Sequence, residues 1–229
     1  MTGSFSTLIL AACAFIGVHL LPSTPLRGGL VKLLGGNGYM AMFSVATGAA
    51  LIWYAAAYSA APYRELWPAV AVLRYVALVI MPFAMILLVC GYTTRNPMAV
   101  MQEKHFHATD PAPGILKVTR HPIMWAIALW ALSHIAANGD QASLIFFGGL
   151  AALALLGMPL MDHRRAETLG AAWGPFALTT SAIPFAAALQ GRAKPRLSEI
   201  GWWRIALGLA LYAGAMAAHG SLLGPSALP

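Results

Sequence analysis

The sequence predicts an all-α protein, a polytopic integral membrane bundle of about six transmembrane helices. Its composition is the first reason: 59% of the 229 residues are hydrophobic and 9% are charged, against roughly 25% charged in soluble domains. The second reason is that uncharged apolar runs recur, most of them near the roughly 20 residues that span a bilayer as a helix. We expect a single membrane-embedded domain over residues 1–229, with helices near residues 4–21, 38–61, 69–91, 119–137, 142–161 and 204–223.

The first run, residues 4–21, differs from a secretory signal. It has no positively charged start, it is longer than the usual ~7–15 apolar residues, and it carries His19 near its end. We therefore expect it to stay as the first helix. The second and third runs are long enough to span on their own.

The fourth run is the shortest, because its uncharged part begins only at Pro122. We expect residues 119–121 to extend it into the membrane interface. The fifth and sixth runs are rich in glycine and alanine, and small residues let helices approach closely in lipid. Packing between helices is the interpretation we give to those small residues.

Basic residues predict the orientation of the bundle. The loops after the first, third and fifth helices hold twelve of the 14 lysines and arginines, and the other face has only Arg64 and Arg74. The positive-inside rule makes those three loops cytoplasmic and both termini periplasmic. Insertion and contact with anionic lipid headgroups account for the net charge of +7. No nucleic-acid-binding pattern accompanies it, so the expected partner is the lipid bilayer.

The long loops at residues 92–120 and 162–203 carry aromatic and basic residues suited to the membrane surface. Trp173, Trp202 and Trp203 are the expected interfacial anchors. Cys13 and Cys90 lie in apolar runs without C-x-x-C spacing, so we expect two small buried hydrophobes. A structural zinc site usually includes cysteine among its four ligands, and these two are badly placed for one.

Seven histidines divide into two groups. His105, His107 and His163 lie in polar, charged loops, where a solvated surface position is expected. An imidazole without a partner is costly in hydrocarbon, so intramembrane histidines are functional candidates. Two neutral imidazoles from different helices suit a six-coordinate haem iron. The candidates for such a site are His19, His121, His134 and His219.

Helix geometry leaves the pairing of these four histidines open. His134 follows His121 by thirteen residues, or about 20 Å along a helix, and belongs near the outer side, whereas His19 belongs near the inner side. Axial nitrogens on one iron lie ~4 Å apart, since metal–nitrogen bonds are about 2 Å long. Either the first helix is displaced or tilted so that His19 meets His134, or the pairs are His19 with His121 and His134 with His219.

Several short motifs resemble one family of bacterial membrane proteins, the NnrU family, which is related to the 15-cis-ζ-carotene isomerase of plants and cyanobacteria. The matching motifs occur in the family's order and cover most of the chain. They are His19 with Arg27, R-N-P at 95–97, G-I-L-K-V-T-R-H-P at 114–122, L-W-A-L-S-H-I-A-A-N-G-D at 129–140, D-H-R-R at 162–165, T-S-A-I-P-F at 180–185 and G-R at 191–192.

The resemblance implies a haem b cofactor whose iron is held by His19 and His134, with His121 as the next candidate. It also implies the inner membrane of a bacterium and a part in nitrogen-oxide (denitrification) metabolism. The alternative that it implies is a haem-dependent cis–trans isomerase of a carotenoid or other polyene or prenyl lipid. In the isomerase a nearby cysteine exchanges as an iron ligand, but Ala131 occupies that position here. Alanine cannot ligate iron, so the resemblance does not carry ligand exchange to this chain.

A third function follows from a different likeness. Arg120-His121-Pro122 at the start of a helix, W-G-x-F at 173–176 and I-P at 183–184 are similar to elements of the isoprenylcysteine and related membrane methyltransferases. That likeness implies S-adenosylmethionine binding at the cytoplasmic face. Those enzymes have adjacent glutamates before the W-G segment, whereas this chain has D-H-R-R followed by Glu167.

Overall fold

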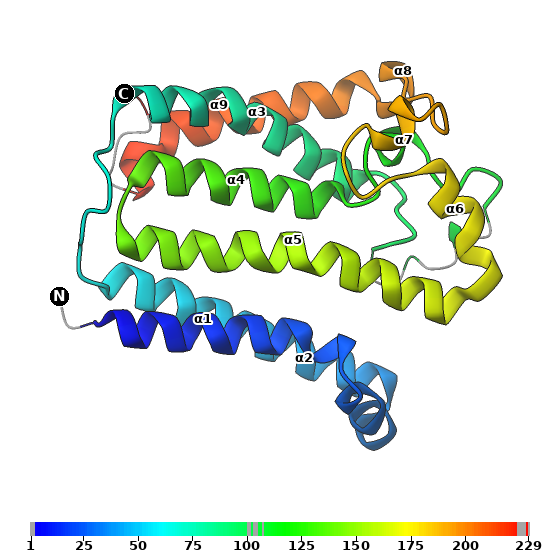
Figure 1. The fold of residues 1–229 in the computed structure, drawn as a ribbon, viewed down its shortest axis with the longest axis horizontal. Coiled ribbons are helices and arrows are strands. Elements are labelled where there is room, and N and C mark those ends of the chain that lie inside the picture. Colours follow the sequence, from blue (N-terminus) through cyan, green and yellow to red (C-terminus); the bar gives the residue numbers. More distant parts are fainter. Residues whose placement is uncertain (1–2, 100–101, 103–104, 107, 224–227, 229) are drawn as a thin grey trace.

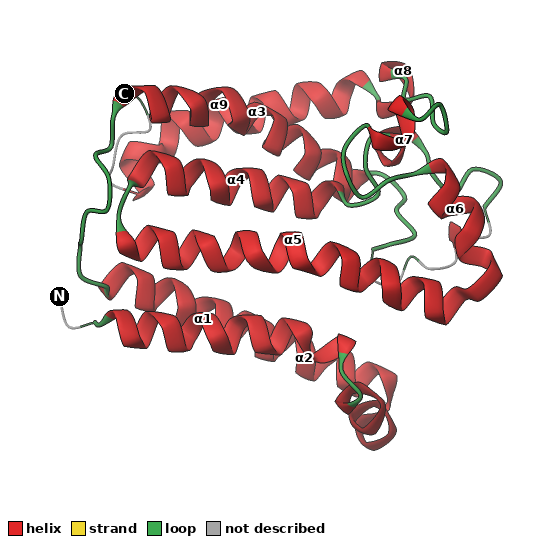
Figure 2. Cartoon of the chain, viewed as in Figure 1, coloured by secondary structure: helices red, strands yellow, loops and turns green. Residues whose placement is uncertain are grey.

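The structure is a computed structural model that describes residues 3–99, 102, 105–106, 108–223 and 228. The described chain is all-α, as predicted, and its β structure is limited to one isolated bridge between Glu65 and Asp140 (Figures 1 and 2). The long helices are α1 Phe5–Leu20, α2 Leu26–Ala60, α3 Ala71–Thr93, α4 Pro122–Asn138, α5 Gln141–Leu169 and α9 Trp202–Leu223. The short ones are α6 Trp173–Thr179, α7 Ala186–Leu189, α8 Leu197–Ile200 and the 3-10 turns η1 Leu21–Ser23, η3 Gly114–Lys117 and η4 Gly170–Ala172.

Five helical stretches are long and apolar enough to cross a membrane, and they contain α1, α2, α3, α5 and α9. The sixth apolar helix, α4, has 17 residues and spans about 26 Å at 1.5 Å per residue. The protein is therefore a multi-pass membrane protein with an all-α bundle.

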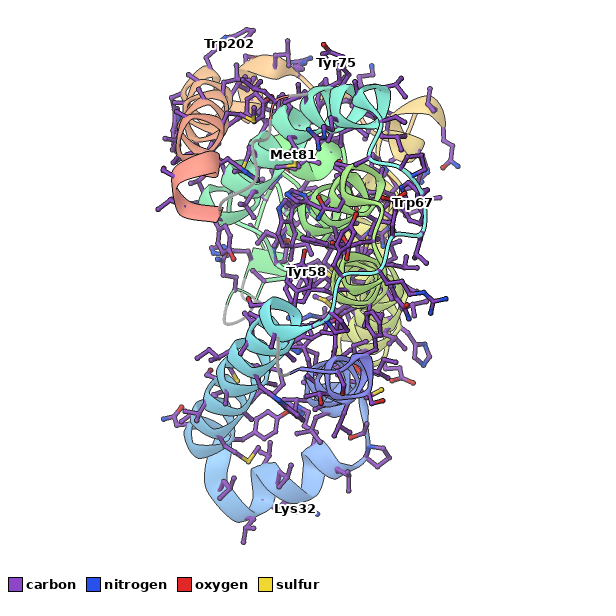
Figure 3. The ribbon with its side chains drawn as sticks, turned by 90° about the vertical axis from the view of Figure 1, so that its left-hand side faces the viewer. Lys32, Tyr58, Trp67, Tyr75, Met81 and Trp202 are labelled. Atoms are coloured by element: carbon purple, nitrogen blue, oxygen red, sulfur yellow. The ribbon has the colours of Figure 1, made fainter. Side chains whose placement is uncertain are left out.

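The helices form a slab in which each helix mainly contacts its immediate neighbours. The contacts between helices give the order α9, α3, α4, α5, α1 and α2 across the slab. Figure 1 shows α3 and α9 overlapping at the top, α4 and α5 in the middle, and α1 and α2 overlapping at the bottom. Figure 3 looks along the helices and shows Trp202 and Lys32 at opposite edges, with Tyr58 between them. One buried core joins α1, α2, α4 and α5, and a second surrounds Phe176 and Leu116 where the short helices gather.

The bundle has two distinct ends. At one of them, which we call the His134 end, α4 stops and α5 begins, and the carbonyl of Gly139 accepts hydrogen bonds from the amides of Leu66 and Trp67. Gly139 has φ 69°, and a Cβ there would lie 2.3 Å from the Trp67 carbonyl oxygen, so glycine is required. At the opposite end, the Asp162 end, α5 continues into α6, α7 and α8 (Figure 1).

Three helix boundaries differ from the expected ones for local reasons. α2 begins at Leu26 instead of 38, and it turns sharply at Gly35, which has φ 70° and ψ 167°. α5 runs past residue 161 to Leu169, because arginine, alanine and glutamate after the apolar run all favour helix. α4 begins at Pro122 instead of 119, since proline disfavours helical geometry in the residue before it.

The expected interfacial tryptophans lie in two settings. Trp202 and Trp203 begin α9 and are exposed, as a membrane-surface position requires. Trp173 is only half-buried but packs inward, with its ring centroid 5.6 Å from that of Phe176. It therefore contributes to the core of the Asp162 end.

Candidate functional site

Arg120 and His121 both bind the carboxylate of Asp162 at the Asp162 end of the bundle. Arg120 Nη1 lies 3.3 Å from Asp162 Oδ2, and His121 Nε2 lies 2.8 Å from Asp162 Oδ1. The His121 side chain is buried, and only about a fifth of the Asp162 side chain is exposed. The R-H-P element is thus joined to the extension of α5.

The same element is also held by the segment after α6. Thr119 Oγ1 and Trp125 Nε1 both donate to the carbonyl of Ala182, at 2.8 and 2.7 Å. The Arg120 amide donates to the Ser181 carbonyl, and the Phe185 amide donates to the Val118 carbonyl. Two motifs that are 60 residues apart in sequence, around 118–122 and 180–185, therefore form one hydrogen-bonded unit.

Arg120 is a buried cation in this unit. Its Nη2 donates to the Thr180 carbonyl, its guanidinium lies 5.3 Å from the ring centroid of Trp173, and its Nε has no hydrogen-bond partner among the described residues. Burial lowers the pKa of Arg120, and the charge of Asp162 opposes that shift. An arginine still keeps its charge under these conditions, so Asp162 is its neutralising partner.

A second site lies at the His134 end, where two histidines from different helices face each other. His134, near the end of α4, and His219, near the end of α9, have ring centroids 6.5 Å apart, with ring planes inclined by 27°. His134 Nδ1 lies 2.8 Å from the carbonyl oxygen of Trp130, an arrangement in which Nδ1 carries the proton. That tautomer leaves the lone pair on Nε2.

The separation of the two ring centres suits a metal ion that His134 and His219 would hold between them. At ~2 Å per metal–nitrogen bond, and about 1.1 Å from each nitrogen to its ring centre, two imidazoles across one ion have centroids about 6.3 Å apart. The observed 6.5 Å is close to that value. Metal-bound histidines usually donate their other ring N–H to a carbonyl or carboxylate, as His134 does to Trp130.

Aromatic side chains surround His134. The rings of Trp130 and Phe147 have centroids 5.2 and 4.9 Å from that of His134. Trp130 also lines an apolar groove of about 180 Å³ between α3 and α4, together with Met81, Met85 and Ile127. An apolar ligand in this groove would contact Trp130, whose ring packs against His134.

Comparison with known proteins assigns the family. The family model described as "NnrU protein" matches residues 7–227, nearly the whole chain. The chain belongs to the NnrU family. It is also 35% identical to the chloroplastic 15-cis-zeta-carotene isomerase of Zea mays over 81 residues, which are 35% of this chain and 22% of that protein. For the Arabidopsis thaliana isomerase the identity is 37% over 79 residues, 34% of this chain and 22% of the relative.

The matched segment thus spans about a fifth of each plant relative. No solved structure matches the chain. The resemblance drawn from the motifs is therefore confirmed at the level of the family, and its haem ligands are predictions that these comparisons leave untested.

The structure of this NnrU-family chain separates His19 from His134. His19 lies in the last turn of α1, at the end of that helix away from the His134 end, and α5 lies between α1 and α4 (Figure 1). Its Nδ1 bonds to the Phe15 carbonyl at 2.8 Å, and its ring packs near Phe15 and Phe43. The described chain thus brings His134 to His219, and joins His121 to Asp162.

The remaining predicted positions are simpler. His163 is exposed and pairs with Glu167 at 3.2 Å, in keeping with a surface position, His105 is half-buried, and His107 lies outside the described residues. Cys90 is buried as expected, but Cys13 is exposed. α1 packs through the face that carries Leu8, Ala11 and Phe15, so Cys13 points outward.

Asp162 is the residue that the sequence did not single out as a partner for His121. The signal that could have found it is D-H-R-R directly after an apolar helix, facing R-H-P at the start of another. Within the described ranges no group of three or more histidine, cysteine or acidic side chains could hold a metal ion. In the His121 site, Asp162 binds both Arg120 and His121, and the methyltransferase interpretation stays a prediction.

Proposed function

We propose that this NnrU-family protein binds haem b in the membrane, with the iron held by His134 and His219. The observation that carries the proposal is the facing imidazole pair at 6.5 Å, contributed by two transmembrane helices. The resemblance to the family supplies the identity of the cofactor. His134 belongs to the ligand pair implied by the resemblance, and His219 was an open alternative for its partner.

The chain's own residues would hold and shield such a group. The Trp130 carbonyl fixes the tautomer and ring orientation of His134. Phe147 and Trp130 pack beside the imidazole and keep water from it. Haem bound here would supply one-electron chemistry.

Family membership supports a role in nitrogen-oxide metabolism, in the inner membrane of a bacterium. The loops with most of the basic residues all lie at the Asp162 end, in agreement with a cytoplasmic position for that end. The His134 end would then face the periplasm. A cysteine-accessibility or reporter-fusion measurement of the two termini tests this orientation.

The first test is the absorption spectrum of the purified full chain after haem-replete expression. We expect a Soret band that shifts on reduction, and His134→Ala should lose most of it. His163→Ala is the matched control, because His163 is exposed and contacts only surface groups. Absence of a Soret band in the wild-type protein, or full haem loading of His134→Ala, would overturn the proposal.

A second candidate function is haem-dependent isomerisation of a polyene lipid. The identity to the two plant isomerases supports it, as does the apolar groove that shares Trp130 with the histidine site. Ala131 weighs against a mechanism that exchanges a cysteine ligand at this position. Incubation of the reduced, haem-loaded protein with a cis-configured carotene tests it, with the His134→Ala protein as control. Failure to convert the substrate would leave haem binding and nitrogen-oxide chemistry as the function.

A further inference from the structure

A second pocket, lined by several polar and charged side chains, lies at the Asp162 end, opposite the pair of His134 and His219. It has a volume of about 330 Å³, at the small end of the roughly 300–1,000 Å³ usual for ligand sites. Four chain segments form its wall: the loop before η3, η3 itself, α6 and the turn after α7. The side chains that determine its chemistry are Thr109, Asp110, Lys117, Thr179, Arg192 and Lys194.

Positive charge dominates this wall. Among the described residues, three cations and a single carboxylate, that of Asp110, line the pocket. Glu199 lies beside it and pairs with Lys117 at 2.6 Å. Even with Glu199 counted, the cations remain in excess, so the pocket favours an anionic group over a neutral or cationic one.

Two of the three cations are fixed before any ligand binds. Arg192 Nη1 donates to the carbonyls of Ala177, Leu178 and Thr180 at the end of α6, and its Nε and Nη2 donate to Gln190 Oε1. Lys117 is held by Glu199, and it lies 3.7 Å from Asp110. Lys194 is exposed, so it is free to close on a bound group. Preorganised cations lose little entropy on binding an anion.

We propose that this pocket binds a phosphate group, with Lys117, Arg192 and Lys194 as its charged ligands and Thr109 as a hydroxyl donor. Phosphate suits the wall because it accepts several hydrogen bonds at once and carries more charge than a carboxylate. The group has two sources, the headgroup of an anionic lipid and a free phosphorylated compound. The same residues would recognise either one.

The test uses the full chain in a neutral detergent and compares two arms. One arm titrates inorganic pyrophosphate at constant ionic strength, and the other adds phosphatidylglycerol, with phosphatidylcholine as its reference lipid. The readout is the shift in thermal midpoint, from which an apparent Kd follows. Stabilisation in the first arm identifies a free phosphate as ligand, and stabilisation only in the second identifies a lipid headgroup.

Matched variants separate the pocket from general charge effects. Lys194→Gln removes one charge-assisted hydrogen bond and should raise the apparent Kd for the probe about tenfold. Lys32→Gln is the control, since Lys32 is equally exposed but lies on α2 at the far edge of the slab (Figure 3). Asp110→Asn keeps the oxygen that caps the Ala112 amide and removes the negative charge, so it should tighten binding.

The two variants on the pocket wall must therefore change affinity in opposite directions. Equal effects of Lys194→Gln and Lys32→Gln would overturn the proposal, and so would the lack of stabilisation in both arms. The haem spectrum of all three variants should stay unchanged, because the pocket lies at the opposite end from His134 and His219.

Discussion

His121 Nε2 lies 2.8 Å from Asp162 Oδ1, and this contact joins the start of α4 to the part of α5 that extends beyond its apolar run. The same carboxylate neutralises Arg120 through its other oxygen. One acid therefore binds both polar residues of the R-H-P element. His121 was expected within the membrane as a candidate metal ligand, and it is buried. It binds Asp162, however, and does not pair with another histidine as His134 does.

Asp162→Asn should destabilise the protein strongly. The amide presents a donor toward either Arg120 or His121, and it leaves the buried guanidinium without a neutralising charge. Breaking a buried ion pair costs about 3–5 kcal/mol, and we expect the lower end because Asp162 is partly exposed. The apparent Tm at a fixed scan rate should fall by about 6–12 °C.

Glu167→Gln is the control for this substitution, since it makes the same chemical change five residues further along α5. Both partners of its ion pair with His163 are exposed, so Glu167→Gln should lower the free energy of unfolding by less than about 1 kcal/mol. The Tm should therefore change little. A similar Tm for both variants would show that the Asp162 contacts contribute little to stability.

The slab explains what the sequence could and could not predict. Hydrophobic runs and glycine placement depend on local chemistry, so the spans and the all-α class were predictable. Which helices become neighbours depends on side-chain packing between distant segments, and the position of α5 between α1 and α4 is of that kind. That position adds a lateral separation of His19 from His134 to the difference in membrane depth that helix spacing already indicated.

The Asp162 site was only half predictable for the same reason. The R-H-P motif was visible in the sequence. Asp162 lies beside it only because α5 continues as a helix beyond its apolar run, to Leu169. The pair of His134 and His219 could be anticipated as one alternative, because α4 and α9 cross the bundle in the same direction and both histidines lie near the C-terminal ends of these helices. Trp130 and Phe147 beside that pair were not anticipated, since aromatic residues are common in every apolar run.

Acid should weaken the contact between η3 and α8. Lys117 Nζ lies 2.6 Å from Glu199 Oε2, and this hydrogen bond holds the pKa of Glu199 below its ordinary 4.5. A carboxyl group with a lowered folded-state pKa stabilises the fold above its unfolded pKa, and that stabilisation is lost as the pH falls through the folded pKa. Glu199→Gln should therefore lower stability at pH 7 by at most about 1 kcal/mol, because the pair is partly exposed.

Thermal denaturation at pH 7 and at successively lower pH values checks this dependence. The difference between wild type and Glu199→Gln should shrink once the pH falls below the ordinary pKa of glutamate and disappear below the folded value. A difference that persists unchanged to the lowest pH at which the wild-type protein stays folded would mean that the charge of Glu199 is not the cause.

His219→Ala and His19→Ala together distinguish the two ligand pairs for haem. If iron is held as the imidazole geometry supports, His219→Ala should reduce haem loading as much as His134→Ala does, since either change leaves one axial nitrogen. His19→Ala should retain loading and the wild-type Soret position, because His19 lies at the other end of α1 from the His134 site. Haem content per protein, measured by the pyridine haemochrome method on the purified variants, gives the comparison. Loss of haem from His19→Ala with full loading of His219→Ala would instead favour the pair that the family resemblance implies, and would require α1 to sit differently against α4 than it does in this slab.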